Sequence, residues 1–501
     1  MAAAAASSST STSSFGREFV QRWRESQVGP GDLPFYDAHD AGDVARLAGC
    51  TSTPLAFHLG TGTSLFTTVL LPAVLAARAE VLFVTCFWAP SASLTALSDA
   101  LRRLAVYRES TARTGDHKVT VPPLRVRIGL SSMPSLWQKL LHTSAPAGYV
   151  YPPHEWARLL GLPDRDTLEA GRIELRVKSL FFTPFSLVHP KFVVVDRERA
   201  FLPSCNVSWE AWLEGCVEMR GEAVASLVDY YARTWEPALE LQRPASVPEP
   251  AGQIPPLDGH QAGLKAVASP VHSTVAFTPV AATVPTLLLP SSHHRNPAFR
   301  PFFWQSPPPA PATPLNIALL QLLASAAQSI YVQTPDVTAA PAVDALLAAL
   351  ERGVHVTVVT SRNIKPGEQL LTAGTTTPWC LRGLVRRYVR LAARSLVLEP
   401  GEVEALRPRL GDLRVSYFGA RAAAERVEDE EPVHTHVKVT LVDGRYAVLG
   451  SGNMDRASWF TSQELGILFE HVGFATSVRK ALDQALEGRL ECLFDSAHSG
   501  T

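Results

Sequence analysis

One arrangement of residues occurs twice in this chain of 501 residues, and it restricts the fold more than any other feature. The copies begin at His189 and His436, and in each a lysine follows after two residues, an aspartate after seven and an asparagine after seventeen. The expected elements before each copy also repeat, as helix, strand, helix, strand. They cover 64–79, 81–87, 93–105 and 124–128, and then 315–328, 329–333, 342–352 and 355–359. This repetition indicates a duplicated unit.

The alternation of helices and strands predicts an α/β fold with a central sheet covered by helices. We therefore expect two similar α-β-α sandwich lobes. Sixteen of the 39 prolines fall between 244 and 314, where few regular hydrogen bonds can form. The expected organisation is a disordered low-complexity N-terminus (1–30), a first lobe (31–243), a proline-rich linker with at most a few short strands (244–313) and a second lobe (314–501).

The charge balance gives the whole chain no electrostatic reason to approach nucleic acid or an anionic membrane, since 46 basic residues face 47 acidic ones. The longest apolar run, 65–77, is too short to cross a bilayer. No basic residue precedes Arg17 and no apolar signal core is present, so we expect no signal peptide. Six cysteines without a C-x-x-C pair favour a reducing compartment and no structural zinc. The expected location is cytoplasmic or peripheral to a membrane.

The duplicated residues suit chemistry at a phosphate. Side chains two apart on a strand share a face, so His189 with Lys191, and His436 with Lys438, can converge on one ligand. Imidazole, ammonium and amide groups aimed at one point suit a tetrahedral anion. One imidazole can attack phosphorus while the other protonates the leaving oxygen, which requires no metal or other cofactor.

A glutamate follows each motif at a similar distance, Glu218 at 29 residues after His189 and Glu464 at 28 after His436. Each is predicted to orient its own histidine through the far ring nitrogen. Pro203 stands where the second copy has Gly450. Because proline fixes φ and lacks an N–H, we expect the loop that presents Ser204 and Asn206 to lie differently from its counterpart.

The repeated pattern, H-x-K-x4-D-x6-G-S-x-N, resembles that of the phospholipase D superfamily. The resemblance implies two lobes related by a pseudo-twofold axis, with one active site between them. It also implies a phosphohistidine at His189, with His436 as general acid and then base. The residues expected to hold the phosphate are Lys191, Lys438, Asn206, Asn453, Ser204 and Ser451. The motif aspartates Asp196 and Asp443 complete the candidate catalytic set, and in the family they are usually structural supports.

Residues 329–335 and the Arg352-Gly353-Val354 run resemble the cardiolipin-synthase-like branch of that superfamily, although Asp336 replaces an aromatic residue of the branch. The leading hypothesis is a metal-independent phosphodiesterase or phosphatidyltransferase acting on glycerophospholipids. The alternatives are a nuclease of the same superfamily and a membrane-associated interaction protein with a vestigial site. The absence of a broadly basic surface argues against nucleic acid as the partner.

Outside the motifs, Arg382, Arg386, Arg390 and Arg394 recur every four residues opposite an apolar side, which predicts an amphipathic basic helix. It can be the solvated face of a packed helix or an element that meets anionic lipid. A second candidate for membrane contact combines Phe15, Phe19 and Trp23 with Arg17, Arg22 and Arg24. Trp212 and Trp459 are expected in the core, and His434 at the rim of the site.

Overall fold

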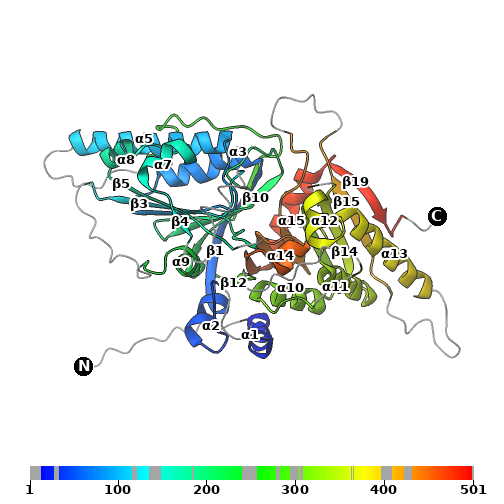
Figure 1. Cartoon of the computed structure of the whole chain (residues 1–501). Coiled ribbons are helices and arrows are strands. Elements are labelled where there is room, and N and C mark those ends of the chain that lie inside the picture. The colour runs from blue at the N-terminus through cyan, green and yellow to red at the C-terminus, as the bar shows by residue number, and fades with distance from the viewer. Residues whose placement is uncertain are drawn as a thin grey trace, which may run out of the picture.

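The computed structural model describes residues 13–26, 33–114, 121–134, 148–182, 186–239, 257–277, 283–293, 304, 309–362, 364, 366–395, 409–421 and 431–498. Figure 1 shows two α/β lobes side by side, joined through the strands between them. The predicted α/β class is confirmed.

The first lobe orders its strands, from the outer edge inward, as β5-β3-β2-β8-β9-β10-β1. The strands are β1 (Cys50–Gly60), β2 (Glu80–Val84), β3 (Leu124–Leu130), β5 (Ile173–Ser179), β8 (Phe192–Val195), β9 (Arg199–Pro203) and β10 (Glu214–Gly221), with the short β4 (Tyr149–Val150) beside β5. The dipeptide strands β6 (Phe181–Phe182) and β7 (Ser186–Leu187) pair separately. The helices are α3 (Gly62–Leu65), the π-helical turn η1 (Phe66–Leu70), α4 (Leu71–Leu75), α5 (Ala92–Thr114), α7 (Pro153–Leu160), α8 (Arg165–Ala170) and α9 (Glu222–Trp235).

The second lobe repeats this order as β15-β14-β13-β16-β17-β18-β12, where β12 is Val284–Ser291, with β19 added outside β15. Its strands are β13 (Ser329–Thr334), β14 (His355–Ser361), β15 (Leu413–Phe418), β16 (Val439–Val442), β17 (Tyr446–Gly450), β18 (Glu464–Glu470) and β19 (Leu490–Asp495). Its helices are α10 (Pro314–Ser325), α11 (Ala340–Glu351), α12 (Pro366–Ala373), α13 (Thr377–Ser395), α14 (Arg456–Phe460) and α15 (Val472–Leu486).

The strand that completes the second lobe lies in the predicted linker. β12 (Val284–Ser291) pairs with β18 on one side and with β1 on the other, and β11 (Ser273–Ala276) also pairs with β1. Since β1 and β12 are antiparallel neighbours in the middle of the continuous sheet, each is the counterpart of the other. Pro285 and Pro290 lie within β12 and made it hard to recognise from the sequence, because a proline within an apolar run normally argues against a central strand. The repeat therefore begins earlier than the sequence pattern indicated.

Helices cover both faces of the first-lobe sheet, as its strand sequences require. Along β2, Val81 and Phe83 belong to the apolar cluster that includes α5 and α8, whereas Leu82 and Val84 belong to the cluster that includes α9. Figure 1 shows α5, α7 and α8 on one side of this sheet and α9 on the other. Strands buried on both faces read as continuous apolar runs, which is why this strand was recognisable from sequence.

The N-terminal segment is more ordered than predicted. Although 1–30 was expected to be disordered, Ser14–Ser26 forms helix α1, which packs against α10 and against α2 (Ala41–Ala48). Phe15, Phe19 and Trp23 are buried in this contact, so the expectation that they could meet a membrane is wrong. Residues 1–12 lie outside the described part of the chain. Within that part, no helix has the length and apolar character needed to span a bilayer.

Candidate active site

The two motif histidines occupy equivalent positions, in the extended segments that lead into β8 and β16. Reciprocal backbone hydrogen bonds tie these segments to the other lobe. The His189 amide donates to the Gln463 carbonyl (2.9 Å), and the His436 amide donates to the Leu213 carbonyl (2.8 Å). In each case the acceptor is the residue before a glutamate, which opens β18 or β10. The backbone therefore places each histidine beside a glutamate of the opposite lobe.

The histidine–glutamate pairs cross between the lobes. His189 Nδ1 lies 2.9 Å from a carboxylate oxygen of Glu464, and His436 Nδ1 lies 2.9 Å from a carboxylate oxygen of Glu214. All four side chains are largely buried. Since Nδ1 is engaged in each ring, Nε2 is the nitrogen that chemistry at phosphorus would use.

This arrangement corrects the predicted orienting residues. Glu464 pairs with the histidine of the other lobe, not its own, and Glu218 pairs with neither, because its carboxylate binds Arg199 (2.6 Å) and lies 3.5 Å from His58 Nε2. Counting from the histidines selected Glu218 because the two loops differ in length. Glu214 lies eight positions after Asn206, but Glu464 lies eleven positions after Asn453, where helix α14 is inserted.

The motif serines hold these glutamates, which differs from the phosphate-binding role predicted for them. Ser204 Oγ donates to Glu214 and accepts from the Gly215 amide, and Ser451 Oγ donates to Glu464 (2.5 Å) and accepts from the Leu465 amide (3.0 Å). Neither serine lines the cavity described below. Both serines act on the carboxylate that orients a histidine.

Pro203 does not displace the first loop, contrary to expectation. The Ser204 amide donates to the Gly215 carbonyl at 2.8 Å, as the Ser451 amide donates to Leu465 at 3.0 Å. Only Gly450 has a positive φ, 147°, and a β-carbon there would lie 2.2 Å from the Leu465 carbonyl oxygen. The proline position has no such conformation, so both half-sites keep the same serine–glutamate geometry.

The motif lysines are buried directly behind the histidines. Lys191 Nζ donates to the His189 carbonyl (2.9 Å) and Lys438 Nζ to the His436 carbonyl (2.7 Å). Burial lowers the pKa of Lys191, and it lowers that of Lys438 to about 7 against the opposing pull of Glu214. Neither lysine is a lining residue of the cavity. Their charges therefore lie behind the imidazoles, where a bound anion would favour protonated ammonium groups.

The motif aspartates lie at the opposite ends of the strands from the histidines and outside the cavity. Asp196 accepts from the backbone amides of 78–80 at 2.8–3.2 Å, and Asp443 accepts from those of 327–329 at 2.8–2.9 Å. Both aspartates have φ near +50°, which Asp tolerates better than most residues. Each therefore fixes the chain where it enters β2 or β13, and neither lines the cavity, so the structure supports the part of structural support for both.

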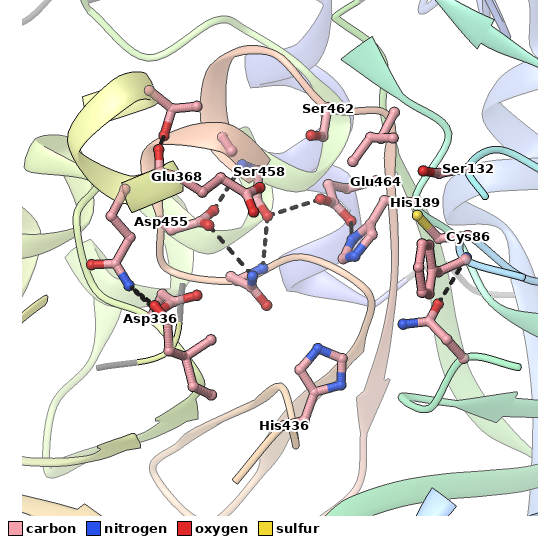
Figure 2. Close-up of a pocket in the computed structure, with 18 of the residues that line it drawn as sticks. Cys86, Ser132, His189, Asp336, Glu368, His436, Asp455, Ser458, Ser462 and Glu464 are labelled. Atoms are coloured by element: carbon pink, nitrogen blue, oxygen red, sulfur yellow. Dashed lines mark hydrogen bonds and ion pairs between the residues drawn. The ribbon is translucent and has the colours of Figure 1, made fainter. Parts of the chain in front are cut away.

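Both histidines line one cavity of about 380 Å³ between the lobes. Figure 2 shows His189, Glu464 and His436 around this space, with Asp336, Glu368 and Asp455 on the wall from the second lobe. The remaining lining residues that bear on the chemistry are Asn206, Asn453, Trp209, Glu210, Trp212 and Ser458. The structure thus brings together the predicted histidines and asparagines, and Asp336, which replaces an aromatic residue of the branch, faces the same cavity.

The asparagines are positioned by contacts at one end of their amides. Asn206 Oδ1 accepts from the Phe87 amide (3.1 Å), which leaves its NH₂ group as the donor toward a ligand. Asn453 Nδ2 lies 3.5 Å from Asp455, whose carboxylate caps α14 through the Ser458 amide. Burial raises the pKa of Asp455 to about 6. The cavity therefore offers donors beside an acidic wall.

The two glutamates differ in acidity although their positions match. Burial raises the pKa of both, but at Glu464 the contacts with His189, Ser451 and Lys191 outweigh it, and the pKa is lowered. At Glu214 burial prevails, with a further rise from nearby Glu210, and its pKa is about 7. Burial also lowers the pKa of His189 despite the opposing effect of Glu464.

Sequence reasoning missed Glu214, Glu210, Asp455 and the contact of Trp212. The Trp212 ring lies 4.9 Å from that of His436 and lines the cavity, so its expected place in the core is wrong, whereas Trp459 is buried as predicted. His434 stacks edge-on with Trp212 at 6.2 Å and is not a lining residue. The offsets from the tryptophans gave no signal for Glu214, because Glu464 follows Trp459 by five positions whereas Glu214 follows Trp212 by two.

Among the described residues, no group of three or more His, Cys, Asp or Glu side chains is arranged to hold a metal ion.

Known proteins resemble this chain in sequence over the second lobe and in overall fold. Residues 319–486 match the family model described as cardiolipin synthase, PLD-like domain. The structure resembles phosphatidylserine synthase of Haemophilus influenzae Rd KW20, with a TM-score of 0.50 and 13% identity over 89% of each chain. Residues 319–486 therefore resemble a PLD-like domain of the cardiolipin synthase type, and the chain as a whole shares the fold of that phosphatidylserine synthase. The phospholipase D family member Nuc of Salmonella typhimurium also matches, with 19% identity and a TM-score of 0.23, over 36% of this chain and 90% of Nuc. A comparison with curated proteins found no match.

Proposed function

We propose that the protein is a metal-independent phosphodiesterase or phosphatidyltransferase that acts on glycerophospholipids through a phosphohistidine. The observation that carries the proposal is the pair of crossed histidine–glutamate contacts on one cavity. A phospholipid substrate is supported by the cardiolipin synthase family model and by the structural similarity to a phosphatidylserine synthase.

In the proposed reaction His189 Nε2 attacks phosphorus and a bond from phosphorus to the leaving oxygen breaks. The leaving oxygen takes a proton from His436 Nε2, so the first product departs as a neutral alcohol. Glu464 holds Nδ1–H of His189 and stabilises the positive charge that develops on its ring. The Asn206 and Asn453 amides donate to the phosphoryl oxygens, and the lysines behind the histidines add positive potential.

The second step reverses the proton transfer. His436 takes a proton from water or an alcohol, whose oxygen attacks phosphorus while the bond to His189 breaks. Glu214 suits this role because its pKa of about 7 lets this carboxyl, which contacts Nδ1 of His436, gain and lose a proton near neutral pH. The acceptor decides whether the reaction is hydrolysis or transfer.

The test is turnover of mixed-lipid vesicles in the presence of a chelator. Phosphatidylglycerol, phosphatidylserine and phosphatidylcholine would be offered with water, glycerol or phosphatidylglycerol as acceptor, and products separated by headgroup. We expect headgroup release or exchange that survives chelation and is absent from His189→Ala. Folded protein that turns over none of these lipids would contradict the proposal, and cleavage of single-stranded oligonucleotides instead would favour the nuclease alternative.

We also propose that α13 contacts an anionic membrane. Its apolar side packs inward through Leu381, Leu384 and Tyr388, while the arginines at 382, 386, 390 and 394 are exposed. Each exposed basic residue near an anionic surface contributes about 1 kcal/mol of attraction. Sedimentation with phosphatidylglycerol vesicles, but not with phosphatidylcholine vesicles, is expected, and an R386E/R390E variant should sediment less. Equal binding to both vesicles would contradict membrane contact through this face.

A further inference from the structure

A second cavity, of about 450 Å³, lies beside the candidate active site in the second lobe. It runs between α11 and α13, and the lining is mainly small or apolar. The lining residues are Thr338, Ala340, Val343, Asp344, Ala373, Gly374, Thr375, Trp379, Cys380, Gly383, Leu384 and Arg387. Its only charged lining residues, Asp344 and Arg387, pair with each other at 2.6 Å. We call this space the α11–α13 groove.

The groove adjoins the candidate active site. Thr338 lines both cavities, and it is held in place by its hydroxyl, which accepts from the Arg456 amide at 3.0 Å. Helix α12 lies along both, since Gln369 and Thr372 line the active-site cavity and Ala373 lines the groove. The two cavities therefore adjoin at Thr338 and along α12.

Gly383 keeps the groove open. It lies in the middle of α13, where glycine is an unfavourable residue, and a β-carbon built on it meets no atom within 4 Å. Its neighbour Leu384 is completely buried. A larger residue at position 383 would extend into the space without disturbing the backbone, because the position needs no positive φ.

The outer end of the groove lies at the exposed face of α13. Trp379 lines the groove and is 59% exposed, and Arg382 and Arg386 are exposed on the same helix. Tryptophan suits the boundary between apolar and aqueous surroundings, and exposed arginines suit the headgroups of a surrounding anionic membrane. The groove therefore opens on the face of α13 that we propose to contact the membrane.

We propose that the α11–α13 groove binds an acyl chain of the glycerophospholipid whose phosphate occupies the candidate active site. This inference rests on the proposed function and deepens it, because it assigns a chain-length preference to the same substrate. Each methylene that an acyl chain buries adds to its binding free energy, so filling the groove should lower the affinity for long-chain lipids more than for short-chain lipids.

The test compares Gly383→Leu with Gly367→Leu, which makes the same change at another helical glycine with open space, outside both cavities. Each is assayed on dioleoyl and on dihexanoyl phosphatidylglycerol in mixed micelles. We expect Gly383→Leu to lower kcat/KM for the dioleoyl lipid on the order of tenfold and to leave the dihexanoyl lipid within twofold. Gly367→Leu and the small Gly383→Ala should leave the ratio of the two unchanged. An unchanged ratio in folded Gly383→Leu would overturn the inference.

A second measurement keeps the groove testable if the parent protein turns over neither lipid, which would contradict the proposed function alone. A phosphatidylglycerol with a diazirine at the end of one acyl chain is photolysed with the intact protein, and labelled peptides are identified by mass spectrometry. Labelling within 338–344 and 373–387, lost in Gly383→Leu, is expected. Labelling only elsewhere would overturn the inference.

Discussion

The two half-sites share a backbone framework and differ in the charge that the framework holds. In one, His189 contacts Glu464, which also accepts hydroxyl hydrogen bonds from Ser451 and Ser458. In the other, His436 contacts Glu214, which accepts from Ser204. Burial raises the pKa of Glu214, with a smaller contribution from nearby Glu210, whereas His189, Ser451 and Lys191 outweigh burial at Glu464. The extra donor of Glu464, Ser458, comes from α14. The duplicated strands therefore supply symmetric positions, and the loops between them make the positions chemically unequal.

This inequality matches the proposed division of labour. A nucleophile needs a partner that stays ionised while the ring becomes positive, which describes Glu464. A group that must both give and take a proton is served by a partner carboxyl with a pKa near neutrality, which describes Glu214 beside His436.

The largest expected effect separates the two histidines. His189→Ala should lower kcat on the order of 10⁵-fold or more on every substrate, because no covalent intermediate can form. His436→Ala should lose about 10²- to 10⁴-fold on phospholipids. With a nitrophenyl phosphodiester, whose leaving group needs no proton, His436→Ala should still release about one equivalent of nitrophenol in a rapid burst. A burst in His189→Ala and none in His436→Ala would reverse the assigned roles.

The glutamates should differ in the next largest effect. Glu464→Gln should lower kcat by about 10²- to 10⁴-fold, because a neutral amide cannot stabilise the imidazolium. Glu214→Gln should cost less, on the order of tenfold at pH 7, since Glu214 is already partly protonated there.

The pH profile of kcat provides the control for this difference. Below pH 7 the Glu214 carboxyl is protonated and no longer accepts the His436 proton as an anion, so parent activity should fall with an apparent pKa near 7. Glu214→Gln should lack this acidic limb, and Glu464→Asp should retain it. If the parent and Glu214→Gln showed the same acidic limb, the inferred charge difference between the half-sites would be contradicted.

Glu214 should also affect stability in a pH-dependent way. Its pKa is raised from 4.5 to about 7 on folding, so the native state binds this proton more tightly than the unfolded state does. The free energy of unfolding is therefore lowered as the pH rises from about 4.5 to about 7. The penalty at pH 8 is on the order of 3 kcal/mol. Urea unfolding of the parent and of Glu214→Gln should therefore agree more closely at pH 4.5 than at pH 8, where the variant should be the more stable. A variant that is less stable at pH 8 would contradict the raised pKa.

The smallest expected effect concerns the two motif aspartates, which have matching contacts outside the active site. Asp196→Ala and Asp443→Ala each remove acceptors for three backbone amides, and each should lower the free energy of unfolding by about 1–3 kcal/mol. Turnover per folded molecule should stay within a few fold. A loss of turnover comparable to that of a histidine variant, with unchanged unfolding, would return these aspartates to the catalytic machinery.

The strands and the two histidines were predictable from sequence because their signals are local. Apolar runs such as 81–84 and the spacing from His189 to Asn206 can be recognised in the sequence without knowledge of the fold. The partner of each histidine was not predictable in this way, since the glutamate lies on the other lobe and the count between motif and glutamate changes with α14.

The central strand β12 escaped for a different reason. Pro285 and Pro290 agreed with the prediction of a proline-rich linker over these residues. Only the pairing with β1 and β18 identifies the segment as the counterpart of β1. The serines show the same limit: Ser204 and Ser451 had the right positions in the motif, but whether a hydroxyl faces phosphate or carboxylate depends on the opposite strand.

The most direct test of the account is to locate the covalent phosphorus. His436→Ala would be mixed with an activated phosphodiester, quenched in alkali and digested, and the modified peptide sequenced by mass spectrometry. The account predicts an acid-labile phosphoryl group on His189 alone, at close to one equivalent per chain. Phosphorus on another residue, or turnover without any covalent intermediate, would contradict the claim that the crossed half-sites act on a single phosphorus atom in unequal roles.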